Sequence, residues 1–138
     1  MELYSYLLSV RAARSDAEWA RLRLQELAEG VPLPSMDFQP HGRSGGVSDR
    51  TAAMAISRIR RREYATEKLE TALRTLNEFR GIIQDADLNE QAAAALWAVW
   101  GMGMTRREAG KRLGMSTLQA SGLVREAETV IRPAVEKL

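Results

Sequence analysis

The chain contains no cysteine and a single histidine, His41, among its 138 residues. The absence of cysteine excludes disulfide bonds and thiolate metal sites. A lone histidine in a stretch rich in glycine and proline is typical of a solvated loop, since structural zinc needs four ligands. We therefore expect no metal, no cofactor and a reducing, cytoplasmic setting.

Long apolar runs are absent too. None approaches the roughly 20 residues that a membrane span requires. The first ten residues, MELYSYLLSV, have neither a basic leader nor an adequate apolar core for a signal peptide. We expect no membrane partner.

The residue types of common active sites are scarce as well. No cysteine nucleophile and no glycine-rich phosphate loop is present, and the carboxylates are spread along polar helix faces. We expect no catalytic residues, and therefore a protein that is not an enzyme.

Apolar residues recur along the chain with helical periodicity, and this pattern predicts an all-α fold with a long antiparallel hairpin in residues 1–84. The first helix is predicted at about residues 2–29, where apolar side chains recur at intervals of three and four. They are Leu3, Leu7, Val10, Ala13, Ala17, Ala20, Leu24 and Leu27. The pattern Ser15-x-x-Glu18 allows the helix to restart, so two shorter helices are the alternative.

A linker is predicted at residues 30–47, where three prolines prevent a continuous helix. A loop of this length is unusual inside a compact domain. It is either disordered or packed on a partner through its apolar residues. We favour partial order around Phe38 and mobility over residues 43–46.

The second helix is predicted at about residues 49–83, with Ser48 or Asp49 as its N-cap. Its apolar stripe, which is broken at Glu63 and Thr66, consists of Ala52, Ile56, Ile59, Leu69, Leu73, Leu76, Phe79 and Ile83. A helix of roughly 50 Å with one apolar face must bury that face, and pairing with the first helix is the simplest solution. The same stripe suits the pairing of two subunits, so we expect a homo-oligomer.

Four arginines in five residues form a second basic patch within this helix: Arg58, Arg60, Arg61 and Arg62. Three interpretations stay open, and the first is favoured: a solvated flank of a coiled coil, a second nucleic-acid contact, or a surface for an acidic protein partner.

Residues 85–138 are predicted to form a separate three-helix domain. Its first helix is capped by Asp87 or Asn89, continues through AAAALWAVW and ends near residue 101. This helix supplies the third element that two short helices need to enclose a core. We interpret Trp97 and Trp100 as packing residues rather than as base-stacking groups.

Residues 106–125 fit the spacing of a DNA-binding helix-turn-helix. The small residues Ala109 and Gly110 stand where the two helices would cross, and Ala120 and Leu123 are the inward positions of the second helix. Two short helices around a glycine turn also occur in proteins that never touch DNA, so the pattern alone does not decide the function.

The boundaries of both helices carry local signals. Thr105-x-x-Glu108 and Ser116-x-x-Gln119 have the form of capping boxes. Gly114 stands where the first helix must end in the left-handed conformation that glycine adopts without penalty.

Charge favours the DNA-binding interpretation. Residues 105–125 carry five basic side chains and one acidic side chain, a net charge of +4, whereas the whole chain is only +2. Positive charge is therefore concentrated where a phosphate backbone would lie.

These positions define two sets of candidate site residues. The base-reading candidates face outward at the start of the second helix: Thr117, Leu118, Gln119, Ser121, Gly122 and Arg125. The phosphate-contacting candidates are Arg106, Arg107, Lys111, Arg112 and Ser116. We expect Gln119 to make a bidentate contact to adenine, Arg125 to bind guanine or phosphate, and Leu118 to contact a thymine methyl.

Two segments carry a resemblance to a known family. Residues 44–51, SGGVSDRT, and residues 100–116, WGMGMTRREAGKRLGMS, resemble the ArpU/RinA group of phage late-gene transcriptional regulators. The second segment also resembles the C-terminal promoter-reading domain of sigma factors. The resemblance implies a phage or prophage regulator in the cytoplasm of a bacterial host, with double-stranded DNA and RNA polymerase as partners.

Two alternatives stay open. A small terminase subunit, which packages DNA, also joins a helix-turn-helix to a helical oligomerisation region. A helical adaptor that does not bind DNA is the alternative from another class, and it would show no salt-sensitive affinity for DNA.

Overall fold

The computed structural model describes residues 1–30 and 44–138, with the side chains of 44–48 excepted. The described residues form only helices, which confirms the predicted all-α class. In chain order they are α1 (Leu3–Ala28), α2 (Ser44–Asp85), α3 (Glu90–Leu96), the π-helix η1 (Trp97–Gly101), α4 (Arg106–Leu113) and α5 (Thr117–Glu136).

Helix α1 begins at a side-chain cap. The Glu2 carboxylate accepts hydrogen bonds from the N–H groups of Tyr4 at 3.0 Å and Ser5 at 2.8 Å. These bonds hold the pKa of Glu2 below its ordinary value, because they favour the ionised carboxylate. The helix then continues without a break through Ser15, so the alternative of two shorter helices is wrong.

Helix α2 begins at Ser44, five residues before the predicted start at 49, so the predicted N-caps Ser48 and Asp49 lie inside the helix. Gly45 and Gly46 lower helix propensity by about 1 kcal/mol each relative to alanine, but unlike proline they leave the hydrogen-bond ladder intact. The prediction of partial order around Phe38 falls outside the described residues, whereas residues 44–47 of the predicted linker belong to α2.

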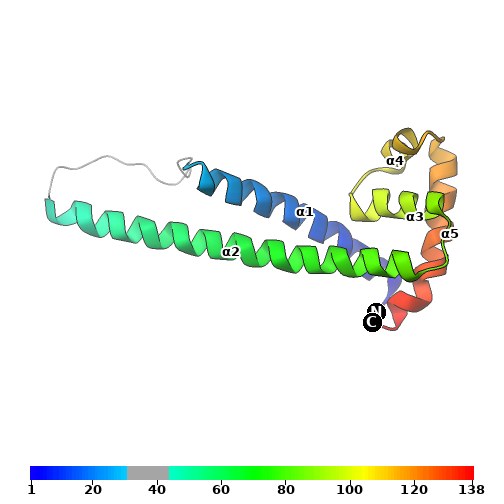
Figure 1. The fold of residues 1–138 in the computed structure, drawn as a ribbon, viewed down its shortest axis with the longest axis horizontal. Helices are drawn as coiled ribbons and strands as arrows, with labels where there is room; N and C mark the ends of the chain where they lie inside the picture. The colour runs from blue at the N-terminus through cyan, green and yellow to red at the C-terminus, as the bar shows by residue number, and fades with distance from the viewer. Residues whose placement is uncertain (31–43) are drawn as a thin grey trace.

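Helices α1 and α2 run in opposite directions and pack along each other (Figure 1). Because α1 has 26 residues and α2 has 42, the N-terminal part of α2 extends beyond its partner. The predicted apolar stripe is therefore only partly buried. Leu76, Phe79 and Ile83 are in the core, whereas Ile56 and Ile59 are exposed, so pairing with α1 buries the apolar face only in the C-terminal part of α2.

The remaining helices gather at the C-terminal end of α2, and α5 lies across that end (Figure 1). One hydrophobic cluster joins them to the long helices, and it includes Leu7, Phe79, Leu96 and Ile131. The cluster crosses the predicted domain boundary at residues 84–85. The two chain ends are neighbours, since the Met1 amino group donates to the carbonyl of Glu136 at 3.3 Å.

The segment after α3 has a wider backbone turn than expected. The N–H of Met102 donates to the carbonyl of Trp97 at 2.9 Å, which is a π-helical i→i+5 bond. The indole of Trp97 lies directly over Gly101, where any Cβ would overlap the ring. Trp97 also stacks on Phe79, with ring centroids 6.0 Å apart, so it serves packing.

Candidate nucleic-acid interface

Helix α4 has the boundaries that its sequence predicts. The Thr105 hydroxyl accepts a hydrogen bond from the N–H of Glu108 at 3.1 Å. At the other end Gly114 is left-handed, with φ 70° and ψ 33°. This conformation reverses the chain and lets the N–H of Met115 donate to the carbonyl of Gly110 at 2.8 Å.

The crossing of α4 with the turn depends on a second glycine. A Cβ at Gly110 would lie 2.9 Å from the carbonyl oxygen of Met115, and backbone atoms cannot move aside as a flexible side chain can. Ala109 and Ala120 are fully buried beside this contact. Small side chains therefore allow the two helices to pack closely.

Helix α5 starts with a complete capping box. The Ser116 hydroxyl accepts from the N–H of Gln119 at 3.1 Å, and the Gln119 side chain accepts from the N–H of Ser116 at 3.0 Å. At Thr105 only the first of the two reciprocal bonds forms. Both predicted helix starts thus lie where the hydroxyl residues place them.

The basic side chains of this region are accessible and lack acidic partners. Arg106, Arg107, Lys111 and Arg112 are exposed on α4, and Arg125 is exposed on α5. No salt bridge among the described residues involves any of them. Their positive charge is therefore not neutralised within this part of the protein.

The first turns of α5 present a mixed surface. Thr117, Leu118 and Gly122 are exposed, and Leu118 retains 84% of its accessible surface. Ser121 is half-buried, so it projects less than predicted. On the inward side Leu123 is only partly buried, and the fully buried position is its neighbour Val124.

Gln119 has two predicted roles, and the structure uses it for the cap. Its Oε1 atom accepts the Ser116 N–H, which uses one of the two lone pairs of the amide oxygen and holds the side chain against the start of α5. A bidentate adenine contact, which needs both amide atoms, therefore competes with the cap for the orientation of this side chain. The side-chain amide nitrogen remains available as a donor.

A shallow hollow of about 560 Å³ lies beside these turns, between α3, the turn and α5. Gly122 and Glu126 line it from α5, and Gln91 lines it from α3. The carboxylate of Glu126 opposes an anion in the hollow. Phosphate contacts are therefore expected on the α4 side of the turn rather than here.

A buried carboxylate attaches α5 to the rest of the molecule. Glu128 is only 4% exposed, and it accepts hydrogen bonds from the Trp100 indole nitrogen at 2.9 Å and the Tyr4 hydroxyl at 3.4 Å. The Arg11 guanidinium lies over the Trp100 ring, 4.2 Å from its centroid, and donates to the carbonyl of Val99 at 3.3 Å. These groups join α1, η1 and α5.

The sequence predictions did not include these residues. Glu128 stands four positions after Val124, on the buried face of α5, which also includes Ala120, Ala127 and Ile131. An acidic residue on an apolar helical face is a usable signal, because a buried carboxylate requires partners. The identity of those partners depends on contacts across 28 residues of sequence for Trp100 and 124 for Tyr4.

The second basic patch lies far from α4 along the long axis of the molecule (Figure 1). Arg58, Arg60 and Arg62 are exposed, and Arg61 is partly buried. From Arg62 to the end of α2 the helix continues for about 35 Å, at about 1.5 Å per residue. The patch therefore forms a surface separate from the cations of α4.

Among the described residues, no group of histidine, aspartate and glutamate side chains is arranged to hold a metal. No described helix is long and apolar enough to cross a membrane. No protein-family model, curated protein or solved structure matches the chain.

Proposed function

We propose that the protein binds double-stranded DNA through α4 and α5, as a phage or prophage transcriptional regulator of late genes in a bacterial host cell. One observation carries this proposal: a closely packed pair of helices presents unpaired basic side chains on α4 beside the exposed first turns of α5. DNA binding by such a pair inserts the second helix into the major groove.

The residues divide into two roles. Arg106, Arg107, Lys111 and Arg112 bind phosphates and fix the register, because charge contacts to the backbone carry no sequence information. Leu118, with its exposed side chain, meets a thymine methyl, and Arg125 reaches guanine or phosphate one turn further along α5. Gly122 leaves open space for a close backbone approach.

A single helix pair buries little surface on DNA, so useful affinity requires a second copy or a larger complex. The part of α2 that extends beyond α1 supplies surface for a partner protein, and RNA polymerase is a candidate partner for a regulator. A homo-oligomer would place two copies of α5 on one duplex.

Salt-dependent binding to duplex DNA tests the proposal. We expect steep weakening with added salt, and we expect Arg112→Ala to reduce the slope of log K against log salt by about 1. Arg74→Ala, which removes an exposed arginine from α2, is the matched control and leaves the slope unchanged. Fluorescence anisotropy with labelled random-sequence duplexes measures both.

The result against the proposal is equally clear. If folded wild-type protein does not bind duplex DNA at low salt, DNA binding through α4 and α5 is wrong, and the protein is a helical adaptor. If Arg74→Ala and Arg112→Ala reduce the slope equally, DNA binds this chain through diffuse charge rather than through α4.

A further inference from the structure

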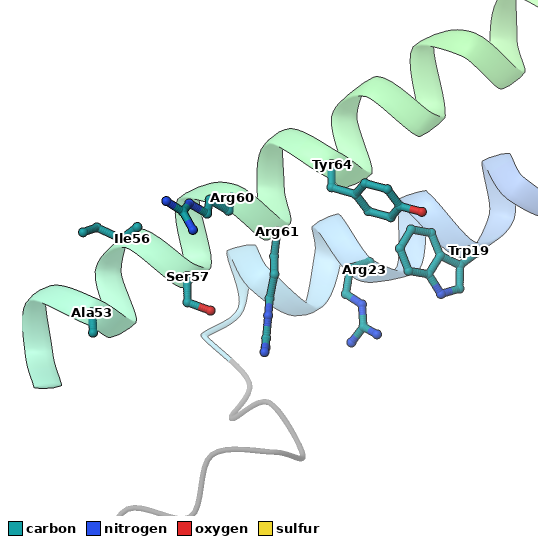
Figure 2. Close-up of a pocket in the computed structure, with 8 residues that line it drawn as sticks. All are labelled: Trp19, Arg23, Ala53, Ile56, Ser57, Arg60, Arg61 and Tyr64. Carbon is teal, nitrogen blue, oxygen red and sulfur yellow. The ribbon is translucent and has the colours of Figure 1, made fainter.

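A groove with no assigned role lies between the C-terminal half of α1 and the N-terminal half of α2. This distal groove is formed by Trp19 and Arg23 of α1 and by Ile56, Arg60, Arg61 and Tyr64 of α2, and its volume is about 560 Å³ (Figure 2). Residues 53–64 of α2, which contribute most of its lining, lie in the half of the hairpin away from α4 (Figure 1). DNA binding by α4 and α5 leaves it unused.

Apolar side chains are exposed in and around the distal groove. Ile56 is 51% exposed and Tyr64 is 57% exposed, and Leu22 on the neighbouring turn of α1 is also largely accessible. At about 25 cal/mol per Å² of apolar surface, covering such side chains stabilises a complex. A cluster of this kind on a helical surface is therefore suited to a protein contact.

The lining of the distal groove contains the arginines Arg23, Arg60 and Arg61 and no acidic residue. Residues 50–62 contain five arginines and no acidic residue. Arg23 has a carboxylate partner, Glu26 at 3.3 Å, whereas no salt bridge among the described residues involves Arg58, Arg60 or Arg62. The complementary ligand must be apolar along its centre and acidic along its edges.

The aromatic rings of the groove are already engaged, which disfavours stacking of nucleic-acid bases. Trp19 and Tyr64 face each other edge to face, with centroids 5.9 Å apart (Figure 2). The Lys68 ammonium lies 5.0 Å from the Trp19 centroid and 5.6 Å from the Tyr64 centroid, and Arg23 lies 5.5 Å from the Trp19 centroid. A phosphate backbone would also have to lie against Ile56, where it loses hydration.

A second copy of the chain is a poor match for the same groove. In a two-fold dimer the same patch faces itself, which would bring Arg23, Arg60 and Arg61 of one copy close to the same residues of the other. Like charges in close contact disfavour an interface. An acidic partner avoids this repulsion.

We infer that the distal groove binds an acidic amphipathic helix of another protein. A helix that lies along α2 places apolar residues at positions i, i+3 or i+4, and i+7 over Ile56, Tyr64 and Trp19. Its flanking glutamates and aspartates pair with Arg60. The surface that would bind this partner therefore shares no residue with α4 and α5, the helices proposed to bind DNA.

Selection from a random peptide library identifies what the groove binds. The full chain is the bait, and Arg60→Glu is the counter-bait. The enriched peptides are expected to be acidic and amphipathic. Their dissociation constants are then measured by fluorescence anisotropy against variants whose helical content is checked by circular dichroism.

The chain offers two matched pairs of variants. In the first pair, Ile56→Ser removes an exposed isoleucine that lines the groove, and Ile59→Ser removes one that does not. In the second pair, Arg60→Glu reverses a charge in the lining of the groove, and Arg62→Glu reverses one outside it. We expect Ile56→Ser and Arg60→Glu to weaken the peptide by about 10-fold or more. The other member of each pair is expected to change the dissociation constant by less than about 2-fold.

Five results would overturn the inference, and four of them come from the peptide experiments. The library could enrich peptides that are not acidic or not amphipathic, or it could enrich none. The two variants of a matched pair could weaken peptide binding equally, or duplex DNA could displace the bound peptide. Sedimentation of the wild type and of Ile56→Ser tests self-association. A dimer that only the wild type forms would assign the groove to a second copy and would also overturn the inference.

Discussion

The indole N–H of Trp100 donates a 2.9 Å hydrogen bond to the carboxylate of Glu128, deep in the interface between η1 and α5. The second carboxylate oxygen of Glu128 lies 3.4 Å from the hydroxyl of Tyr4, so three segments meet at one acidic side chain. A buried carboxylate costs free energy unless it is hydrogen-bonded. Its bonds therefore tie the position of α5 to that of α1 and η1.

Removal of this carboxylate is expected to destabilise the protein. Glu128→Ala leaves the buried Trp100 N–H without a partner and should lower the free energy of unfolding by about 2–3 kcal/mol. Glu128→Gln retains an acceptor oxygen and should cost less. Urea unfolding measures both, and Glu126→Ala on the exposed face of α5 is the control. Equal effects of Glu126→Ala and Glu128→Ala would contradict the bonding role.

Gly110 is expected to tolerate no larger side chain. In Gly110→Ala the new Cβ meets the carbonyl oxygen of Met115 at 2.9 Å, so the turn must shift, at a cost of about 1–3 kcal/mol. Gly81→Ala is the matched control, since a Cβ there has open space within helix α2. That variant should gain about 0.5–1 kcal/mol. Thermal unfolding compares the two, and destabilisation by both would show that the contact is not the cause.

Replacement of Gly122 by alanine is expected to raise the stability of the protein and to weaken its binding to DNA. This position is exposed and open, so Gly122→Ala should stabilise α5 by about 0.5–1 kcal/mol. If α5 approaches DNA closely here, as proposed, the same variant should bind duplex DNA less tightly. Gly81→Ala should gain similar stability with unchanged DNA affinity. Unchanged affinity in Gly122→Ala would contradict close approach at this residue, though not DNA binding itself.

Tyr6 is expected to make stability fall at alkaline pH. Its hydroxyl is buried, and no described atom meets the geometry of a hydrogen bond to it. Burial first, and interaction with the Glu78 carboxylate second, raise the pKa of Tyr6 above its ordinary value of 10.0. The neutral form is thus favoured in the folded state.

The sign of the pH effect follows from this raised pKa. The contribution of the tyrosine is fully present below about pH 10 and is lost as the pH rises, because the unfolded chain then releases its proton first. The free energy of unfolding should fall by at most about 1.4 kcal/mol per pH unit above pH 10 from this group. Urea unfolding at several pH values should show a shallower decline for Tyr6→Phe, and identical declines would refute the assignment.

The best-predicted parts of the protein depend on neighbours in sequence. Each of three helices begins at a side chain that accepts a hydrogen bond from the backbone N–H three residues later, and these capping residues are Asn89, Thr105 and Ser116. Gly114 ends α4. These contacts close within one turn, so residue type and spacing determine them. The start of α2 was predicted less well, because glycine permits a helix without requiring one.

The sequence by itself thus determined the all-α class, the helix boundaries set by caps, and the positive charge of residues 105–125. Only the tertiary structure decided which apolar residues are covered: Phe79 is buried and Ile56 is exposed, although both stand on the predicted stripe of α2. The reason is that α1 ends at Ala28 and cannot reach the far end of its longer partner. The tertiary structure also decided that Glu128 is bonded inside the core, since its partners come from α1 and η1, and a pattern within α5 cannot specify contacts so distant in the chain.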